Sequence, residues 1–311
     1  MIFFWIAVAA AVLTFGLSYA LYFYTFRNSP ELDKRMTRED YLHSPLFHQY
    51  SKEIKQFFSD FDSLDFKRVY IRSRDGLKLA ARYIESAPGA PLCILMHGYR
   101  GEAVGDFCAV IPICRRLGYS VLLPDQRASG ISEGRCQTFG IKERLDTLDW
   151  IKYARKRFGE ETPILLIGIS MGAATVLMTS SDVPDNVKGI FADCAYTSVE
   201  EIIISFAAQK KLPGKLLYPF IKLGAKVFGH FDTDEESPEH AVSKTKVPIC
   251  LIHGYSDDIV PYVMCGRLYD ACPAEKYMVT VDRAGHASSV YENPLKYEKA
   301  LVSFADKVIG Q

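Results

Sequence analysis

The 311-residue sequence lacks an excess of charge of either sign, because 37 basic and 37 acidic side chains give a formal net charge of zero. A nucleic-acid-binding domain needs a strongly basic face, so we expect no nucleic acid among the partners. Internal repeats and low-complexity tracts are also absent. With 49% hydrophobic residues, the chain is long enough for one large α/β domain with a sizeable core.

The eight cysteines form no C-x-x-C pair and no disulfide-dense spacing. Several lie in apolar, strand-like runs; the positions are Cys93, Cys108, Cys114, Cys136, Cys194, Cys250, Cys265 and Cys272. This pattern is typical of reduced, mostly buried thiols. On the same grounds we expect no metal site.

Charged residues are absent from Met1 to Phe26. A helix needs about 20 apolar residues to cross the hydrocarbon core of a membrane, so residues 1–26 are predicted to be a transmembrane anchor in the lipid bilayer. A buried core helix is a minor alternative. A cleaved signal peptide would need a positive n-region and a shorter apolar stretch, and no Lys or Arg precedes Arg27.

Four basic residues, Arg27, Lys34, Arg35 and Arg38, follow this segment, and only the α-amino group precedes it. The positive-inside rule therefore predicts a single-pass membrane protein whose remaining chain is cytoplasmic. Residues 27–64 are predicted to be a juxtamembrane linker with a helix in HQYSKEIKQFFSDF, which packs on the domain or lies at the membrane surface.

From residue 65 to 311, strands alternate with helices, which predicts a mostly parallel sheet with helices on both faces. The expected strands cover residues 67–73, 77–85, 91–98, 119–125, 162–168, 187–194, 247–254 and 276–282, the first two as an antiparallel pair. The expected helices cover residues 103–117, 141–158, 262–272 and 291–309, and a further one begins at Ser170. Ligands of such sheets bind beyond the carboxyl ends of the strands.

Residues 197–245 contain an insertion that this core does not require. It is apolar, with interspersed lysines at Lys210, Lys211, Lys215, Lys222 and Lys226. We expect a helical cap over the site. A basic amphipathic surface that dips into the bilayer interface is the second interpretation, and it suits a lipid substrate.

The stretch GISMG, residues 168–172, follows the apolar run TPILLI and opens a helix rich in small residues. The pattern G-x-S-x-G between a strand and a helix is typical of a nucleophile elbow, whose sharp turn leaves no room for side chains at the glycines. A serine hydroxyl is a weak nucleophile and needs a histidine base, which a carboxylate orients. We therefore expect Ser170 to be a nucleophile.

The partners of such a serine follow in the chain order acid, then histidine. Of the seven histidines, only His286, in the loop DRAGHASS, follows an acid located after a late strand. Asp257 and Asp258 both follow LIHGYS at a strand end; we prefer Asp257, with Asp258 as the alternative.

An oxyanion hole needs two backbone N–H donors. The amide of Met171, at a helix N-terminus, and that of Tyr99, in the loop after LMHG, are the expected donors. This chemistry requires no metal and no organic cofactor.

Six segments together resemble the α/β-hydrolase superfamily, in particular its serine aminopeptidase S33-like and Bem46-like membrane-anchored branch. They are LMHGYRG, LLPDQRASGISEG, LLIGISMGAATVL, ADCAYTS, CLIHGYSDDIVP and AGHASS. The resemblance covers roughly Asp65 to the C-terminus and implies the α/β-hydrolase fold. It also implies Asp257 as the acid, the first Asp after the His-Gly of H-G-x-x-D-x-x-V-P. The family's D-x-R-G-x-G-x-S has Ala128 in place of the commoner glycine.

We therefore predict a membrane-anchored serine hydrolase that cleaves an ester, thioester or amide bond through an acyl-enzyme. An acyl ester or lipid-like substrate is favoured, either a small molecule or an acylated protein. The alternatives are an aminopeptidase-like activity and a non-catalytic membrane scaffold, although a scaffold would be expected to lack a triad member and none is missing. A serine nucleophile argues against a dehalogenase or an epoxide hydrolase.

Overall fold

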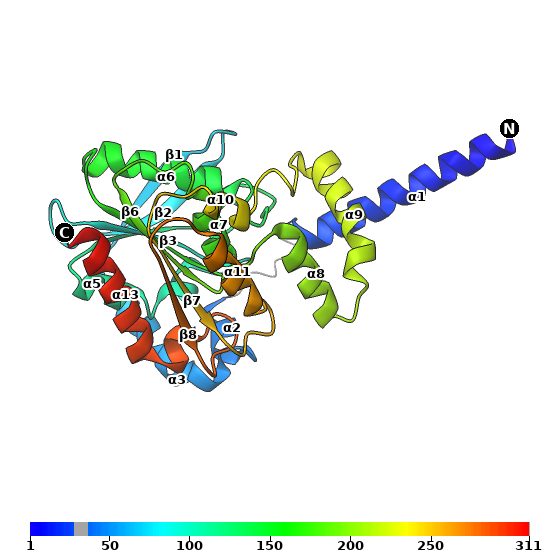
Figure 1. Cartoon of the computed structure of the whole chain (residues 1–311). Coiled ribbons are helices and arrows are strands. Elements are labelled where there is room, and N and C mark those ends of the chain that lie inside the picture. The colour runs from blue at the N-terminus through cyan, green and yellow to red at the C-terminus, as the bar shows by residue number, and fades with distance from the viewer. Residues whose placement is uncertain (28–36, 311) are drawn as a thin grey trace.

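The computed structural model describes residues 1–27 and 37–310. Lys34 and Arg35, which entered the orientation argument, lie outside the described residues, as does part of the 27–64 linker. Figure 1 shows a sheet with helices on both sides and one long helix that projects from the body.

The central sheet has eight strands in the order β1-β2-β4-β3-β5-β6-β7-β8. Their bounds are β1 Lys67–Arg72, β2 Lys78–Ile84, β3 Leu92–Met96, β4 Ser120–Pro124, β5 Ile164–Ile169, β6 Val187–Asp193, β7 Ile249–Gly254 and β8 Lys276–Val281. β2 is antiparallel to both β1 and β4, and all other neighbouring strands are parallel. The predicted mostly parallel sheet, with its antiparallel first pair, is confirmed.

Helices cover both faces of the sheet. Their bounds, with those of the shorter turns, are α1 Ile2–Thr25, α2 Arg38–His43, η2 His48–Tyr50, α3 Ser51–Asp62, α4 Ala103–Phe107, α5 Ile111–Arg116, α6 Glu143–Phe158, α7 Met171–Thr179, α8 Val199–Gln209, α9 Gly214–Gly224, η3 Ala225–Gly229, α10 Pro238–Val242, α11 Val263–Ala271, α12 Ser289–Glu292 and α13 Pro294–Ile309.

The strand residues alternate between two apolar layers, as the two-residue period of a strand requires. In β3, Cys93 and Leu95 face the layer formed by α2 to α5, α12 and α13. Leu92, Ile94 and Met96 face the layer formed by α6, α7, α10 and α11. The sheet is therefore covered on both faces, and its functional surface is left at the carboxyl ends of the parallel strands.

Two predicted helices are each divided in two by a proline. The expected helix 103–117 is α4 and α5, with Pro112 in the first turn of α5. The expected helix 291–309 is α12 and α13, where the Asn293 side chain caps a helix that begins at Pro294. Proline lacks an N–H group and is favoured in the first turn of a helix, where that group has no partner.

The aromatic segment after residue 37 packs on the domain. Ile54, Phe58 and Phe61 of α3 are buried in the same apolar layer as Cys93 and Leu95 of β3. Of the two interpretations of this helix, packing on the domain is the one that the structure shows.

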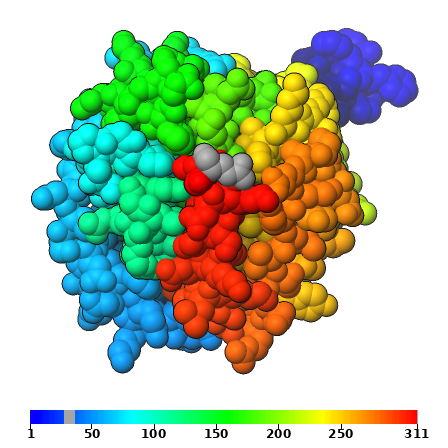
Figure 2. All heavy atoms as spheres, turned by 60° about the vertical axis from the view of Figure 1, so that its left-hand side comes forward, coloured from blue at the N-terminus to red at the C-terminus, as the bar shows by residue number. Residues whose placement is uncertain are grey.

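The long apolar helix α1 has two differently exposed parts. Its first half is exposed and apolar and projects from the body in both views (Figures 1 and 2). Ser18 and Tyr22 are buried against α9 and η3, and Phe26, directly after α1, is buried against Phe139 and Phe231. With about 1.5 Å per residue, the 24-residue helix is about 36 Å long. It is therefore long and apolar enough to span a bilayer while its last two turns belong to the folded domain.

Close contact between α1 and α9 depends on Gly224. A Cβ at this position would overlap the backbone oxygen of Ser18 and would lie 2.8 Å from Cβ of Tyr22. Gly266 of α11 offers a comparison. A Cβ built on this helical glycine would have no neighbouring atom within 4 Å.

We predict that Gly224→Ala and Gly266→Ala have opposite effects on stability. Alanine favours a helix over glycine by about 1 kcal/mol, but overpacking a closed contact costs about 1–3 kcal/mol. Thermal unfolding of the full chain in detergent should give a lower Tm for Gly224→Ala and an equal or higher Tm for Gly266→Ala. Equal shifts for the two variants would show that α1 is not closely packed on α9.

Candidate active site

Ser170 occupies a strained turn between β5 and α7. Its φ of 54° and ψ of −117° lie outside the regions that L-residues favour, and such strain is concentrated at functional sites. A Cβ on Gly172 would overlap the carbonyl oxygen of Met96 in β3, and one on Gly168 would overlap the backbone of Gly172. Both glycines are therefore needed for β3, β5 and α7 to approach so closely.

Ser170, His286 and Asp257 form one chain of hydrogen bonds. Nε2 of His286 lies 2.8 Å from Oγ of Ser170, and Nδ1 lies 2.8 Å from Oδ2 of Asp257. A carboxylate can only accept, so Nδ1–H donates to Asp257 and Nε2 is free to accept the serine proton. The structure thus brings together three residues that lie far apart in the sequence, at the carboxyl ends of β5 and β7 and in the loop after β8.

The carboxylate of Asp257 is fully buried. Burial alone would raise its pKa, but the charges and hydrogen bonds of His286 and His253 outweigh burial and hold the pKa well below its usual value. Its second oxygen, Oδ1, accepts from the amides of Ile259 and Val260 at 2.9 and 2.8 Å. Asp257 is therefore an ionised acceptor in a fixed orientation.

Asp258, the alternative acid, is exposed. Its backbone oxygen accepts a hydrogen bond from Nε2 of Gln209 in α8 at 2.6 Å. The geometry thus favours Asp257 over Asp258 as the partner of His286.

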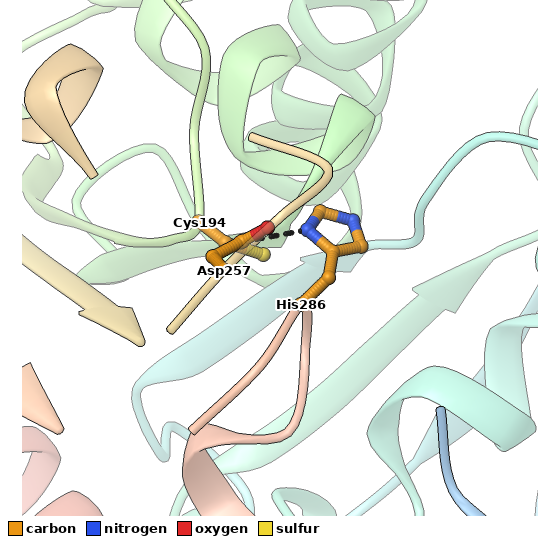
Figure 3. Close-up of side chains that lie close together, drawn as sticks. All are labelled: Cys194, Asp257 and His286. Atoms are coloured by element: carbon orange, nitrogen blue, oxygen red, sulfur yellow. Dashed lines mark hydrogen bonds and ion pairs between the residues drawn. The ribbon is translucent and has the colours of Figure 1, made fainter. Parts of the chain in front are cut away.

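Cys194 lies beside this chain of hydrogen bonds. The sulfur of Cys194, the carboxylate of Asp257 and the ring of His286 offer donor atoms that all lie within 4.8 Å of one another (Figure 3). Metal binding would require a thiolate, whereas burial raises the pKa of Cys194 well above its usual value. Both ring nitrogens of His286 are also engaged, with Asp257 and Ser170. These donors fit a hydrogen-bonded triad better than a metal site.

The loop between β3 and α4 (residues 97–102) borders Ser170. A Cβ built on Gly98 would lie 3.5 Å from Cβ of Ser170. The amide of Gly98 donates to Oδ2 of Asp106 at 2.6 Å, and the Tyr41 hydroxyl donates to the other oxygen of Asp106 at 2.5 Å. Asp106 and Tyr41 therefore hold this loop against the nucleophile.

The amides of Tyr99 and Met171, the two expected oxyanion donors, flank the same serine. Met171 is the first residue of α7, and Tyr99 follows Gly98 directly in the β3–α4 loop. Within the described residues neither amide donates a hydrogen bond to the protein. Neither amide is therefore committed to an acceptor there, while His97 of the same loop accepts from the amide of Gln126 at 3.0 Å and has a structural role.

Several residues around the triad were not found from the sequence. His253, at the end of β7, donates to the oxygen of Val260 at 2.9 Å and lies 3.4 Å from Asp257. Asp193, at the end of β6, is completely buried. The backbone amide of Ser170 donates a hydrogen bond to the backbone oxygen of Asp193. Asp106 and Tyr41 had no sequence signal. For Asp193, its place as an acid at the end of a buried apolar strand was a signal that could have been used.

Known proteins resemble this chain over most of its length. The protein-family description that matches residues 91–211 is "alpha/beta hydrolase fold". A membrane protein of Saccharomyces cerevisiae, YNL320W, is 24% identical over 69% of this chain and 71% of its own. The bem46 protein of Schizosaccharomyces pombe is 23% identical over 69% of this chain and 68% of its own. The esterase Pf2001 of Pyrococcus furiosus is 25% identical, with a TM-score of 0.67 over 81% of this chain and 94% of its own.

The sheet order, the turn at Ser170 and these matches define a hydrolase of the α/β-hydrolase superfamily. The predicted fold is therefore confirmed. Among proteins of this superfamily, the chain is similar to the bem46 protein and to the yeast membrane protein YNL320W.

Asp193 gives this site a testable pH dependence. Burial raises its pKa to about 7, the nearby Asp257 adds to this and His253 opposes it. An unfolded aspartate has a pKa of about 3.9, so the protonated acid favours the folded state. The contribution of protonated Asp193 to the free energy of unfolding is complete at low pH, and it is lost as the pH rises from about 4 to about 7.

We predict that Asp193→Asn, which cannot ionise, becomes stabilising relative to wild type as the pH rises. The Tm of the variant minus that of wild type should increase between pH 5 and pH 7.5. A difference that stays constant over this range would contradict a neutral, buried Asp193.

Proposed function

We propose that this protein is a membrane-anchored serine hydrolase that cleaves acyl esters through an acyl-enzyme on Ser170. The observation that carries the proposal is the continuous hydrogen-bond chain from Oγ of Ser170 through His286 to the buried carboxylate of Asp257. The strained elbow at Ser170 and the esterase fold of the neighbour from Pyrococcus furiosus support it.

In the proposed reaction, Oγ of Ser170 attacks the acyl carbonyl while Nε2 of His286 accepts its proton. Asp257 orients the imidazole and stabilises the imidazolium. The amides of Met171 and Tyr99 bind the developing oxyanion, and losing one such donor costs about 3 kcal/mol. His286 then protonates the leaving oxygen. Water, activated by the same base, releases the acid and restores Ser170.

Membrane anchoring is supported by the exposed apolar length of α1 and by a relative described as a membrane protein. We propose that α1 spans the bilayer once, with the lipid bilayer as its partner. Arg27 and Arg38 follow α1, so the positive-inside rule favours a catalytic domain on the cytoplasmic side. No step of the proposed mechanism involves nucleic acid or a cofactor.

An acyl ester or lipid-like substrate agrees with the surroundings of the cap helices α8 and α9. At their junction, Leu212 and Leu216 are exposed beside Lys210, Lys211 and Lys215. Lys222 and Lys226, in contrast, pair with Asp234 and Asp232. An apolar, basic edge of this kind suits an anionic membrane surface.

We predict that the two adjacent acids have very different effects on ester hydrolysis. Asp257→Asn removes the acceptor that fixes the His286 tautomer and should lower kcat for p-nitrophenyl butyrate by about 10⁴-fold. Asp258→Asn should change kcat by less than about twofold, because the Asp258 side chain is exposed and its backbone oxygen makes the hydrogen bond to Gln209. A large loss in Asp258→Asn with an active Asp257→Asn would contradict the assignment.

We further predict that the full-length wild-type protein prefers acyl esters to amides. The purified chain in lipid nanodiscs should hydrolyse p-nitrophenyl acyl esters with a higher kcat/KM than amino-acid arylamides. Much faster cleavage of arylamides would favour the aminopeptidase-like activity that the sequence left open. A folded protein that cleaves neither class would favour a non-catalytic scaffold.

A further inference from the structure

A cavity of about 340 Å³ lies between the end of α1, the β3–α4 loop and the cap helices. This volume is within the range of small-molecule sites, about 300–1,000 Å³. Its walls are mainly apolar, and they include Leu21 of α1, Tyr99 and Phe139, and Phe206, Ala207 and Leu217 of the cap helices. A helix that could span a membrane therefore supplies part of the wall.

The same end of α1 is fastened to the β3–α4 loop. The last carbonyl groups of a helix have no partner within it. Here the oxygens of Tyr24 and Thr25 accept from the Arg100 guanidinium at 2.9 Å and from the Tyr99 hydroxyl at 2.6 Å. The oxygen of Phe26 accepts from the amide of Gln137 at 2.9 Å. The carbonyl end of α1 is thus capped by the loop that borders the nucleophile.

Tyr99 lies between the cavity and the segment that borders Ser170. The Tyr99 ring stacks on Phe139 at 4.6 Å between ring centroids and forms part of the cavity wall. Its backbone follows Gly98, which lies against Ser170. Met171, next to Ser170, packs in the same apolar cluster as Tyr22 of α1 and Phe26, the residue after α1.

The position of the cavity along α1 agrees with a membrane surface. Twenty residues of helix cover about 30 Å, the thickness of the hydrocarbon core. If α1 spans the bilayer from its first residue, Leu21 to Thr25 lie where the hydrocarbon ends. An acyl chain that leaves the bilayer along α1 would meet the cavity before it meets water.

We propose that this cavity binds the acyl chain of a membrane ester, and that α1 forms one wall of the binding site as well as the anchor. This inference rests on the proposed function for the identity of the reacting bond. The carbonyl of the ester would lie at Ser170, and its chain would pass over Tyr99 into the space between Leu21 and the cap helices.

The first test is a chain-length series of p-nitrophenyl esters, from acetate to dodecanoate, with the full chain in phosphatidylcholine nanodiscs. One buried CH₂ contributes about 0.8 kcal/mol, or about fourfold in kcat/KM. Wild type should show rising kcat/KM with chain length until the cavity is full. Leu21→Trp, which fills the cavity, should stop the rise early, so that the ratio of its kcat/KM for dodecanoate to its kcat/KM for acetate falls well below that of wild type.

The matched control is Leu13→Trp, because Leu13 lies on the same helix and is 74% exposed. It should keep the wild-type series. Since Leu21→Trp could disturb packing, Ala207→Phe fills the cavity from the opposite wall and should shorten the preferred chain in the same way. A series that is flat in wild type, or unchanged in both cavity variants, would overturn the proposal.

The second test does not depend on catalysis. A decanol that carries a terminal photoreactive diazirine is cross-linked to Ser170→Ala protein in the same nanodiscs. Cross-links should map to residues 199–224, and Leu21→Trp introduced into this protein should abolish them, whereas Leu13→Trp should not.

Together the two tests separate the two proposals. Cross-linking without any ester turnover by wild type would retain the cavity assignment and reject the proposed hydrolysis. Ester turnover that shows neither chain-length dependence nor cross-linking would retain the proposed hydrolysis and reject the cavity assignment.

Discussion

The chain turns from β5 into α7 at a single residue, Ser170, and the surrounding geometry depends on this turn. The overlap that any side chain at Gly172 would make with Met96 shows how tightly α7 is packed against β3. This packing brings the start of α7 and the β3–α4 loop to the same serine. Two further non-glycine residues with positive φ, Cys194 and Ala287, adjoin the triad, so strain is concentrated where the strand ends converge.

The strain is held by buried polar contacts on each side of Ser170. Asp106 and Tyr41 fix the β3–α4 loop on one side. Asp257 orients His286 on the other and is itself held by two backbone amides. A site preorganised in this way needs little rearrangement when charge develops on the substrate. Burial also raises the pKa of the neighbouring Asp193 to about 7, so this acid ionises at a higher pH than an exposed aspartate.

The sequence predicted the order and type of most elements because buried parallel strands are continuous apolar runs. Ser170, Asp257 and His286 could be proposed because each follows a strand end within a short motif. The choice of Asp257 over Asp258 was supported in the sequence by a family resemblance. Two adjacent acids after the same strand give no local pattern that shows which side chain faces the histidine. Tyr41 and Asp106, 65 residues apart, could not be paired, because long-range contacts between ordinary polar residues leave no local pattern. The family commonly has glycine where this chain has Ala128. The positive φ of Ala128, 57°, explains that preference, because glycine adopts such a conformation more readily than other residues.

The docking of α1 could not be predicted either, since an apolar run indicates a membrane helix without indicating what its end touches. In the structure that end is continuous with the packing around Ser170. The central claim is that Ser170 is an activated nucleophile, and reaction with a fluorescent fluorophosphonate tests it most directly. Wild type should be labelled at one site, on the peptide that contains Ser170, and Ser170→Ala should not be labelled. An unlabelled but folded wild type, or equal labelling of Ser170→Ala, would contradict the claim.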